Sequence, residues 1–381
     1  SGIRVPGVAA HLRRGGGSAL VTEAVHPARP LWDEARASQA AILLDMAVEL
    51  LQKGFFYTDL HAGNILLDKN SRPVLIDAYE IKPLARIRPR HVIELISQVH
   101  SAYGLKETDL SAAIARLPAC GGQARLIARI KQRSARMHAR RVGRWIRRSL
   151  SDGSFSRRVR GDAYTALVNR RFAVDVPAVI PRLAPMDAPA PIVVGKHTYT
   201  LAPFPRAGWL TTPGAIQAWK GLLTLFFNAV PCVEPVAAIV YRDRSSVLIT
   251  TPLHDVSDLE TWLRHKFIGM EHPQKRLHAA ALGRTIGGLH VKNIWHDELT
   301  CSHILVETDP PRFMFLPSAG VRQCRGLSCE ERLSALARFE DSLPVRVGRT
   351  LKMVFLKAYA DATGDDLHRV ARGVPRPGAG R

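Results

Sequence analysis

The chain has 381 residues, enough for two or three domains, and 46% of them are apolar, which excludes a disordered protein. Its 54 Lys and Arg residues outnumber 33 Asp and Glu, so the net charge of +21 predicts an anionic partner or surface. It contains no apolar run of transmembrane length and no signal peptide, and its five scattered cysteines favour a reducing, cytosolic setting. Because the chain begins with Ser1 and not Met, we expect a fragment of a longer protein.

The first part of the chain predicts a hairpin followed by a helix. Residues 2–25 read as a strand, a turn at Gly15 to Gly17 and a second strand. Residues 34–53 have apolar residues at helical spacing, and Gly54 stands where a C-terminal cap belongs. The segments that follow are predicted as a strand at 64–67, a turn at 68–73, a strand at 74–77, and helices at 90–103 and 110–117.

The middle of the chain is dominated by arginine and then by proline. Residues 125–171 are densely basic, and residues 174–194 contain repeated prolines that favour extended backbone. The basic segment is open to three interpretations: a surface for an anionic membrane or glycolipid, a solvated helix face, and a nucleic-acid site, in that order of preference.

The sequence also repeats itself. Residues 8–22 align without a gap on residues 236–250, and each segment is followed by an amphipathic helix, a polar loop and a strand. The alignment pairs three positions of the two loops, which are Asp59 with Glu298, Asn64 with His303, and Asp77 with Pro317. We therefore expect two copies of one fold, the first of which lacks its beginning.

The loop of the first copy has the spacing of a phosphotransferase site. Asn64 follows Asp59 in a D-x-x-x-x-N pattern, and Asp77 ends the apolar strand that returns after a turn. Phosphoryl transfer needs a carboxylate to orient the attacking hydroxyl and oxygen ligands for Mg²⁺. The pattern therefore predicts Asp59 as the base and Asn64 and Asp77 as metal ligands, with His61 facing the nucleotide or the acceptor. A capped polar loop without chemistry is the simpler alternative.

These motifs resemble the lipopolysaccharide core (Kdo/heptose) kinase family, which has a protein-kinase-like fold. The resemblance rests on "GIRVPGV…SALVTEAV", "FYTDLHAGNILL" and "VLIDAYEIKP" in the first copy and on "CSHILV" in the second. It implies ATP and Mg²⁺ as cofactors and a nucleotide hinge at Glu23, Ala24 and Val25. It also implies a lipopolysaccharide core glycolipid as acceptor and a cytoplasmic enzyme held at the periphery of the inner membrane.

The second copy departs from this pattern. Glu298 stands at the base position, and Pro317, whose side chain cannot bind a metal, stands at the second metal position. The strand expected to carry the phosphate-binding lysine has Ala202 or a neighbour there, so we interpret the second copy as a pseudokinase. A zinc site at His290, His296, Cys301 and His303 is an alternative that we rank below a site without a structural metal.

The sequence thus predicts an α+β chain of two tandem kinase-like domains, the first lacking most of its N-terminal lobe. Residues 1–142 are assigned to the first domain, 143–185 to a basic and Pro-rich connection, 186–375 to the second domain and 376–381 to a disordered tail. The expected activity is ATP-dependent phosphorylation of a sugar hydroxyl in the lipopolysaccharide core. A non-catalytic pseudokinase scaffold and a kinase for a protein or another small molecule are the alternatives.

Overall fold

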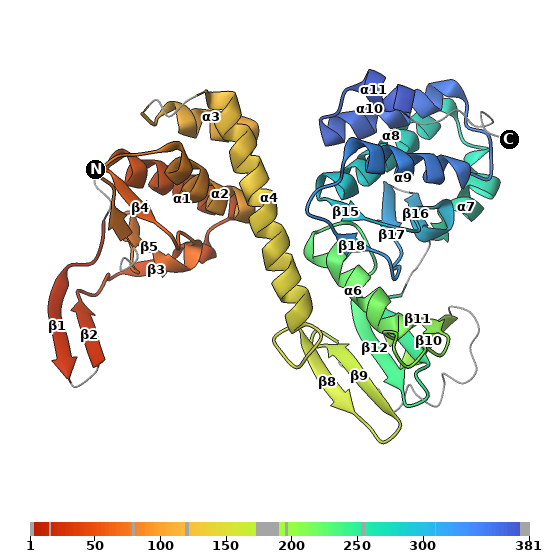
Figure 1. Ribbon diagram of the computed structural model, residues 1–381, viewed down its shortest axis with the longest axis horizontal. Coiled ribbons are helices and arrows are strands. Elements are labelled where there is room, and N and C mark those ends of the chain that lie inside the picture. The colour runs from red at the N-terminus through yellow and green to blue at the C-terminus, as the bar shows by residue number, and fades with distance from the viewer. Residues whose placement is uncertain are drawn as a thin grey trace. The chain divides into compact units, whose positions relative to one another are not determined.

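The computed structural model describes residues 4–14, 17–77, 81–118, 122–172, 190–194, 197–252, 256–308 and 310–373 (Figure 1). Of the predicted turn at Gly15 to Gly17, the first two residues lie outside these ranges, as does the predicted tail at 376–381. The chain divides into two compact units, residues 1–140 and 141–381, and each contains both helices and strands.

The first unit consists of short strands and four helices among its described residues. In chain order its elements are β1 Val8–Arg14, β2 Gly17–Thr22, β3 Ala28–Pro30, η1 Leu31–Asp33, α1 Arg36–Gln52, β4 Phe55–Tyr57, η2 Ala62–Asn64, β5 Ile65–Asp68, β6 Pro73–Leu75, β7 Ile81–Pro83, α2 Pro89–Tyr103, α3 Glu107–Ala115 and α4 Gln123–Arg148, the last of which continues past residue 140.

The helices of the first unit begin and end close to their predicted limits. Helix α1 stops before Gly54, whose φ of 75° is a left-handed conformation that glycine adopts without strain. Helix α2 has Pro89 in its first turn and Gly104, with a φ of 67°, at its end. The predicted helices at 34–53, 90–103 and 110–117 are therefore confirmed as α1, α2 and α3, to within a few residues.

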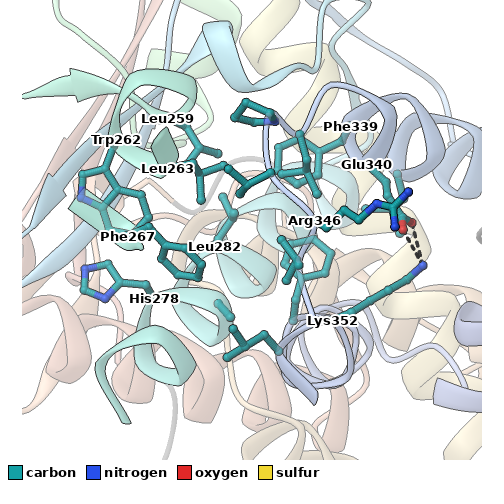
Figure 2. A pocket seen from close by; sticks show the side chains of 18 of the residues that line it. Leu259, Trp262, Leu263, Phe267, His278, Leu282, Phe339, Glu340, Arg346 and Lys352 are labelled. Atoms are coloured by element: carbon teal, nitrogen blue, oxygen red, sulfur yellow. Dashed lines mark hydrogen bonds and ion pairs between the residues drawn. The ribbon is translucent and has the colours of Figure 1, made fainter. Parts of the chain in front are cut away.

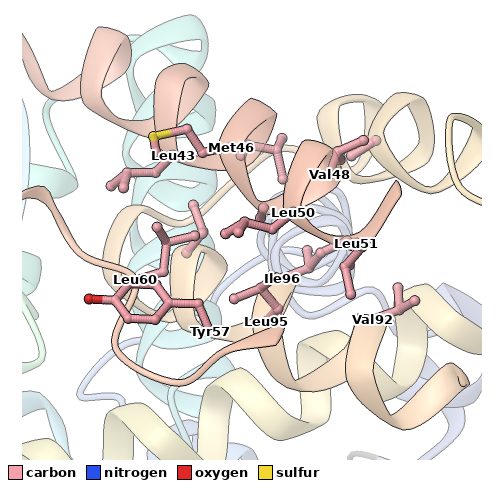
Figure 3. Close-up of a cluster of buried hydrophobic side chains, with 14 of the residues drawn as sticks. Leu43, Met46, Val48, Leu50, Leu51, Tyr57, Leu60, Val92, Leu95 and Ile96 are labelled. Carbon is pink, nitrogen blue, oxygen red and sulfur yellow. The ribbon is translucent and has the colours of Figure 1, made fainter. Parts of the chain in front are cut away.

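One apolar core holds the first unit together. The helices α1 and α2 contribute its centre, and Tyr57 at the end of β4 and Leu60 in the loop after it pack into the same cluster. Figure 3 shows the Tyr57 ring among these side chains, with its hydroxyl oxygen at the edge of the cluster. The core thus fixes the backbone of the loop that carries Asp59.

The second unit joins a six-stranded antiparallel sheet to a mainly helical part. Its elements are β8 Ser156–Arg160, β9 Tyr164–Asn169, β10 Ala190–Val194, β11 His197–Phe204, α6 Gly214–Phe227, β12 Pro235–Tyr241, β13 Ser246–Thr250, β14 Ser257–Asp258, α7 Leu259–Trp262, η4 Leu263–Phe267, α8 His272–Val291, β15 Ile294–Trp295, η5 Cys301–His303, β16 Ile304–Thr308, β17 Pro311–Phe315, β18 Arg322–Gln323, α9 Cys329–Asp341, α10 Arg349–Thr363 and α11 Leu367–Gly373.

The sheet has the order β10-β11-β13-β12-β9-β8. Residues 143–185, which the sequence analysis assigned to a connection, therefore contain β8 and β9 of this sheet. Strand β8 hid in the basic composition because Arg157, Arg158 and Arg160 are exposed on an edge strand, where charged side chains are tolerated. The division between the two compact units falls at residue 140, within helix α4.

Parts of the two units repeat the same pairings. Strand β3 pairs with β5, which pairs with β6, just as β14 pairs with β16 and β16 with β17. The small sheet β4-β7 likewise has a counterpart in β15-β18. The hairpins β1-β2 and β12-β13 also correspond, but Val21 lies opposite Ala10 whereas Ile249 lies opposite Ala237. The ungapped alignment is therefore wrong by one residue in one strand of this hairpin, because it matches Ala10 with Ala238.

Candidate functional site in the loop after β4

The loop between β4 and β5 alternates buried and exposed side chains. Tyr57 and Leu60 are buried in the core, whereas the side chains of Asp59 and His61 are about half exposed, at 55% and 53%. The backbone N–H of Leu60 donates to Gln98 Oε1 at 3.2 Å, which ties the loop to helix α2. The loop therefore presents a carboxylate and an imidazole to solvent from a fixed backbone.

Asn64 is the centre of this loop. It is 9% exposed, and its Nδ2 donates to Tyr57 Oη at 2.8 Å, to the Asp59 carbonyl at 3.0 Å and to Asp59 Oδ2 at 3.3 Å. The side-chain amide thus orients the Asp59 carboxylate and closes the loop upon itself. No hydrogen bond from a described residue reaches the remaining polar atom of the side chain, Oδ1.

Asp77 joins the same group through its backbone. The Tyr57 hydroxyl donates to the Asp77 carbonyl oxygen at 2.6 Å, and the N–H of Ile76 donates to the Asn64 carbonyl at 2.9 Å. The structure therefore brings Asp59, Asn64 and the backbone carbonyl of Asp77 together, and the roles assigned to the three residues stay predictions. Residues 78–80, which follow Asp77, lie outside the described residues.

His61 lies beside the expected base. Its Nε2 is 3.4 Å from Asp59 Oδ2, and its Nδ1 accepts the N–H of Gly63 at 3.0 Å. The second bond places the proton of a neutral ring on Nε2, the nitrogen that faces Asp59. His61 therefore positions the carboxylate from the exposed side of the loop, while Asn64 holds it from the buried side.

The residues fit a magnesium ion in their donor chemistry. Carboxylate and amide oxygens are the protein ligands that Mg²⁺ takes, usually one or two of them beside phosphate oxygens and water. The Asn64 amide oxygen is left over once its nitrogen is bonded, and Asp77 is only partly buried. Across the described residues, no three His, Cys, Asp or Glu side chains cluster in a way that could hold a metal on their own.

The expected hinge precedes β3 on an irregular segment. The N–H of Glu23 donates to the Gly7 carbonyl at 2.8 Å, and its carboxylate lies over Gly7, where a side chain would meet it at 2.5 Å. Glu23, Ala24 and Val25 then lead into β3, which pairs with β5 directly after Asn64. The role of these three residues in holding a nucleotide stays a prediction.

Two residues of this region were missed from the sequence. Tyr57 was read as part of a motif, yet its hydroxyl links Asn64 to Asp77. Trp32, on η1, is 58% exposed, and its ring lies 3.6 Å from where a side chain on Gly63 would begin. A large aromatic residue between Pro30 and Asp33, just before the predicted helix at 34–53, was the available signal for Trp32.

The corresponding loop of the second unit keeps the backbone and changes the chemistry. The N–H of Leu316 donates to the His303 carbonyl at 2.9 Å, the counterpart of the bond between Ile76 and Asn64. His303 Nε2 lies 3.2 Å from Glu298 Oε2, so an imidazole and a longer carboxylate replace the amide and Asp59. Pro317 follows Leu316 and offers no oxygen in its side chain.

Burial also changes the electrostatics of this second loop. His296 occupies the place of Tyr57 and contacts the Leu316 carbonyl through Nε2 at 3.3 Å. Its burial lowers the pKa of the ring to about 4, and burial lowers the pKa of His290 to about 3, so both rings are neutral at pH 7. His290 Nδ1 is 2.8 Å from Tyr359 Oη. These partners are those of core histidines rather than of a metal site.

Among its described residues, the sheet of the second unit carries no lysine where a phosphate-binding residue is expected, and Lys196, which directly precedes β11, lies outside them. Strand β11, with the sequence HTYTLAPF, and helix α6, with the sequence GAIQAWKGLLTLFF, contain neither the lysine on the strand nor an acid on the helix. Protein kinases use an ion pair between these two elements to position ATP. Ala202 lies on β11, as the sequence analysis expects for the position of that lysine.

The helical part of the second unit also encloses a cavity of about 610 Å³ (Figure 2). Its wall is mainly apolar and includes Trp262, Phe267 and Leu282, and the ion pair of Lys352 with Glu340, at 2.6 Å, lies beside it. None of the residues that line the cavity is Glu298, His303 or Pro317. The cavity is therefore separate from the loop of the second unit.

Comparisons with known proteins place one segment of the chain beside a kinase family. Residues 205–316 match the model of the lipopolysaccharide kinase (Kdo/WaaP) family. One similar solved structure is that of WaaP in complex with acyl carrier protein. The match covers 48% of this chain and 77% of the WaaP chain, with 20% sequence identity and a TM-score of 0.40. A crystal structure of WbdD is similar over 49% of this chain and 48% of its own, about half its length, with 13% identity and a TM-score of 0.30. No curated protein matches.

The family match lies entirely in the second unit. It includes Glu298 and His303, whereas Asp59, Asn64 and Asp77 lie outside it. The segment that is similar to a kinase family is therefore the one with the altered loop, and the loop with the expected residues lies in the other unit. Within the described residues, no helix has both the length and the apolar character needed to cross a membrane.

Proposed function

We propose that the protein is an ATP-dependent phosphotransferase that phosphorylates a sugar hydroxyl of the lipopolysaccharide core, with its chemistry in the first unit. One observation carries the proposal: Asn64 holds the Asp59 carboxylate through Nδ2 while Tyr57 links the same amide to Asp77. This geometry supports the spacing read from the sequence. The match of residues 205–316 to a lipopolysaccharide kinase family supports the substrate class.

Each residue of the first loop has a role in this reaction. Asp59 orients the acceptor hydroxyl and accepts its proton, which it can do because its carboxylate is held by Asn64 and remains half exposed. Asn64 Oδ1 and the Asp77 carboxylate would hold Mg²⁺, which neutralises charge on the phosphates when bound. His61 keeps Asp59 in place on the side that faces solvent.

The second unit is proposed to be a kinase-like domain without catalytic activity. Its loop replaces the second metal ligand by Pro317, and the described strand β11 and helix α6 lack the lysine and acid that position ATP. The repeated strand pairings and backbone hydrogen bonds support an origin of both units from one fold. The chain would then be a tandem of an active and an inactive copy.

A basic helix face supports the anionic acceptor. Within the first unit, Arg125, Arg129, Arg136 and Arg140 recur at spacings of four and seven residues on α4 and are all exposed. Such spacing places them on one face of the helix. Arginines close to an anionic membrane contribute about 1 kcal/mol each, so this face favours peripheral contact with the surface that holds the glycolipid. Nucleic acid remains the third interpretation.

Phosphoryl transfer tests the proposal. The full-length protein is incubated with labelled ATP, Mg²⁺ and lipopolysaccharide core oligosaccharide, and a protein acceptor such as casein is offered in a parallel reaction. Label in the oligosaccharide that disappears with EDTA is the expected result. Label in casein alone would contradict the sugar acceptor and favour a protein kinase. Label in neither acceptor would contradict the proposal and favour a non-catalytic scaffold.

A further inference from the structure

The turn between β11 and α6 exposes two adjacent apolar side chains to solvent. Trp209 is 82% exposed and Leu210 is 84% exposed, the highest values among the large apolar residues that the structure describes. Single exposed apolar residues are common on protein surfaces, but two neighbours that are both almost fully exposed are not explained by that background. This turn, residues 205–213, lies within the second unit.

Hydrogen bonds hold this turn in one conformation. The N–H and the hydroxyl of Thr211 both donate to the Gly208 carbonyl, at 3.0 and 2.9 Å. The N–H of Ala207 donates to the Arg244 carbonyl at 3.2 Å, and Gln217 Nε2 donates to the Thr212 carbonyl at 2.7 Å. The two apolar side chains therefore project from an anchored turn, which loses little conformational entropy when it binds.

The surroundings of the turn are positively charged. Arg206 lies on the turn itself, and the turn between β12 and β13 adds Arg242 and Arg244, the latter donating through its guanidinium to the Thr211 carbonyl. Residues 202–217 contain no Asp or Glu. The nearby Asp243 carboxylate accepts the N–H and the hydroxyl of Ser245, at 3.0 and 2.7 Å. These two hydrogen bonds, together with the charge of Arg206, lower the pKa of that carboxyl. The two turns thus contain three arginines and one acid, a net positive charge beside the apolar tip.

We infer that this turn inserts Trp209 and Leu210 into the headgroup region of an anionic lipid bilayer. Tryptophan favours the membrane interface because its ring is apolar and its N–H can remain hydrated, and leucine gains by leaving water for the acyl chains. Arginines in the same region of a surface attract anionic headgroups. A protein partner would bury the apolar tip equally well, but the net positive charge of the two turns favours a surface with a high density of negative charge.

This inference concerns the second unit and does not rest on phosphotransferase activity. It assigns the altered unit a role in membrane contact that is independent of nucleotide chemistry. It also differs from the basic face of α4, which has charge without an exposed apolar tip. The two contacts can be separated by experiment. Loss of the arginine face should weaken binding to anionic vesicles without changing insertion. Loss of the apolar tip should weaken binding and also remove insertion.

Vesicle binding tests the inference. The full-length protein is sedimented with vesicles of phosphatidylglycerol and phosphatidylcholine, and the partition coefficient is compared with that of a Trp209→Ala/Leu210→Ala variant. Because both side chains are exposed, the variant should keep the wild-type melting temperature and lose about tenfold or more in partitioning. Leu277→Ala, which removes an exposed leucine from α8, is the matched control and should leave partitioning unchanged.

Fluorescence quenching locates the contact. Lipids brominated on their acyl chains should quench part of the tryptophan emission of the wild-type protein, and that part should be absent in Trp209→Ala. Wild-type binding in the double variant, or quenching that persists in Trp209→Ala, would overturn the inference. Failure of the wild-type protein to bind anionic vesicles would overturn it as well, whatever its kinase activity.

Discussion

The loops at 57–77 and 296–317 have a similar backbone but different side chains at the aligned positions. In both, the residue after η2 or η5 begins a strand whose partner strand returns to the loop, and the same backbone hydrogen bond closes it, at Asn64 and at His303. The first loop presents a carboxylate held by an amide, and the second presents a carboxylate beside an imidazole. The comparison shows that the backbone of such a loop can be kept while the side chains at the aligned positions change.

The largest difference between the two loops is expected when the carboxylate is removed from each of them in turn. Asp59→Asn keeps an oxygen for the bond from Asn64 but cannot accept a proton, so the rate of transfer to lipopolysaccharide core oligosaccharide should fall about a hundredfold to ten-thousandfold. Glu298→Gln should leave the rate unchanged. Equal losses in both variants would contradict the assignment of the chemistry to the first unit.

Acid should unfold the second unit before the first. Burial holds the pKa of His296 at about 4 and that of His290 at about 3, below the value of about 6.5 in an unfolded chain. The unfolded state therefore binds protons that the folded state does not, and the free energy of unfolding falls as the pH drops from about 6.5 towards 4. At pH 5 the expected loss is about 2 kcal/mol for each histidine.

The first unit has Leu51 and Tyr57, and no histidine, at the corresponding positions. Its acid response rests on His91 and His100, whose pKa burial also lowers. Hydrogen exchange at pH 7 and pH 5, resolved by peptide, measures both units in one sample. A His296→Phe variant should lose part of the acid response of the second unit, and an unchanged response would contradict the role of its burial.

Removing the hydroxyl of Tyr57 should loosen the first loop. Tyr57→Phe leaves the Asp77 carbonyl without its donor and takes one acceptor from Asn64, which should cost about 1–3 kcal/mol of unfolding free energy. His296→Phe should cost less at pH 7, because the bond it removes is longer, at 3.3 Å, and the His296 Nδ1 has no partner among the described residues. Urea denaturation measures the free energy of unfolding of both variants. A larger loss in His296→Phe than in Tyr57→Phe would contradict the prediction.

The smallest expected effect concerns the ends of two corresponding helices. Gly54 after α1 and Asn293 after α8 both have positive φ, of 75° and 54°. Gly54→Ala should cost about 1–2 kcal/mol because an L side chain is strained there. Asn293→Ala should lower the free energy of unfolding by about the same amount, because it removes the hydrogen bond from the Leu327 N–H to Asn293 Oδ1, at 3.0 Å. Melting temperatures check both values.

Much of the first unit follows from its sequence, because local rules decide it. Apolar spacing and Gly54 define α1, and the D-x-x-x-x-N spacing with an Asp at the end of the return strand gives three residues of the candidate site. The link through Tyr57 could not be read in this way, since a hydroxyl at the edge of a core finds its partners only when β4 and β6 are placed. Trp32 was missed for the same reason.

The second unit was harder because its features depend on distant segments. Arginines concealed the edge strand β8, and the turn of the hairpin β12-β13 is one residue longer than that of its counterpart, which an ungapped alignment misses. The cavity is lined by residues of α7, α8, α9 and α10. The apolar faces of these helices predict close packing, so the sequence does not indicate a cavity between them. The substitutions at Glu298, His303 and Pro317 were visible, since they need only an alignment with the first loop.

Nucleotide binding tests the central claim most directly. The melting temperature of the full-length protein is measured with and without ATP and Mg²⁺, in the wild type, in Asp77→Ala and in Pro317→Ala. The account predicts stabilisation in the wild type, its loss in Asp77→Ala and its retention in Pro317→Ala, because the metal and nucleotide would be held by the first loop. Stabilisation that survives in Asp77→Ala, or that is absent from the wild type, would contradict it.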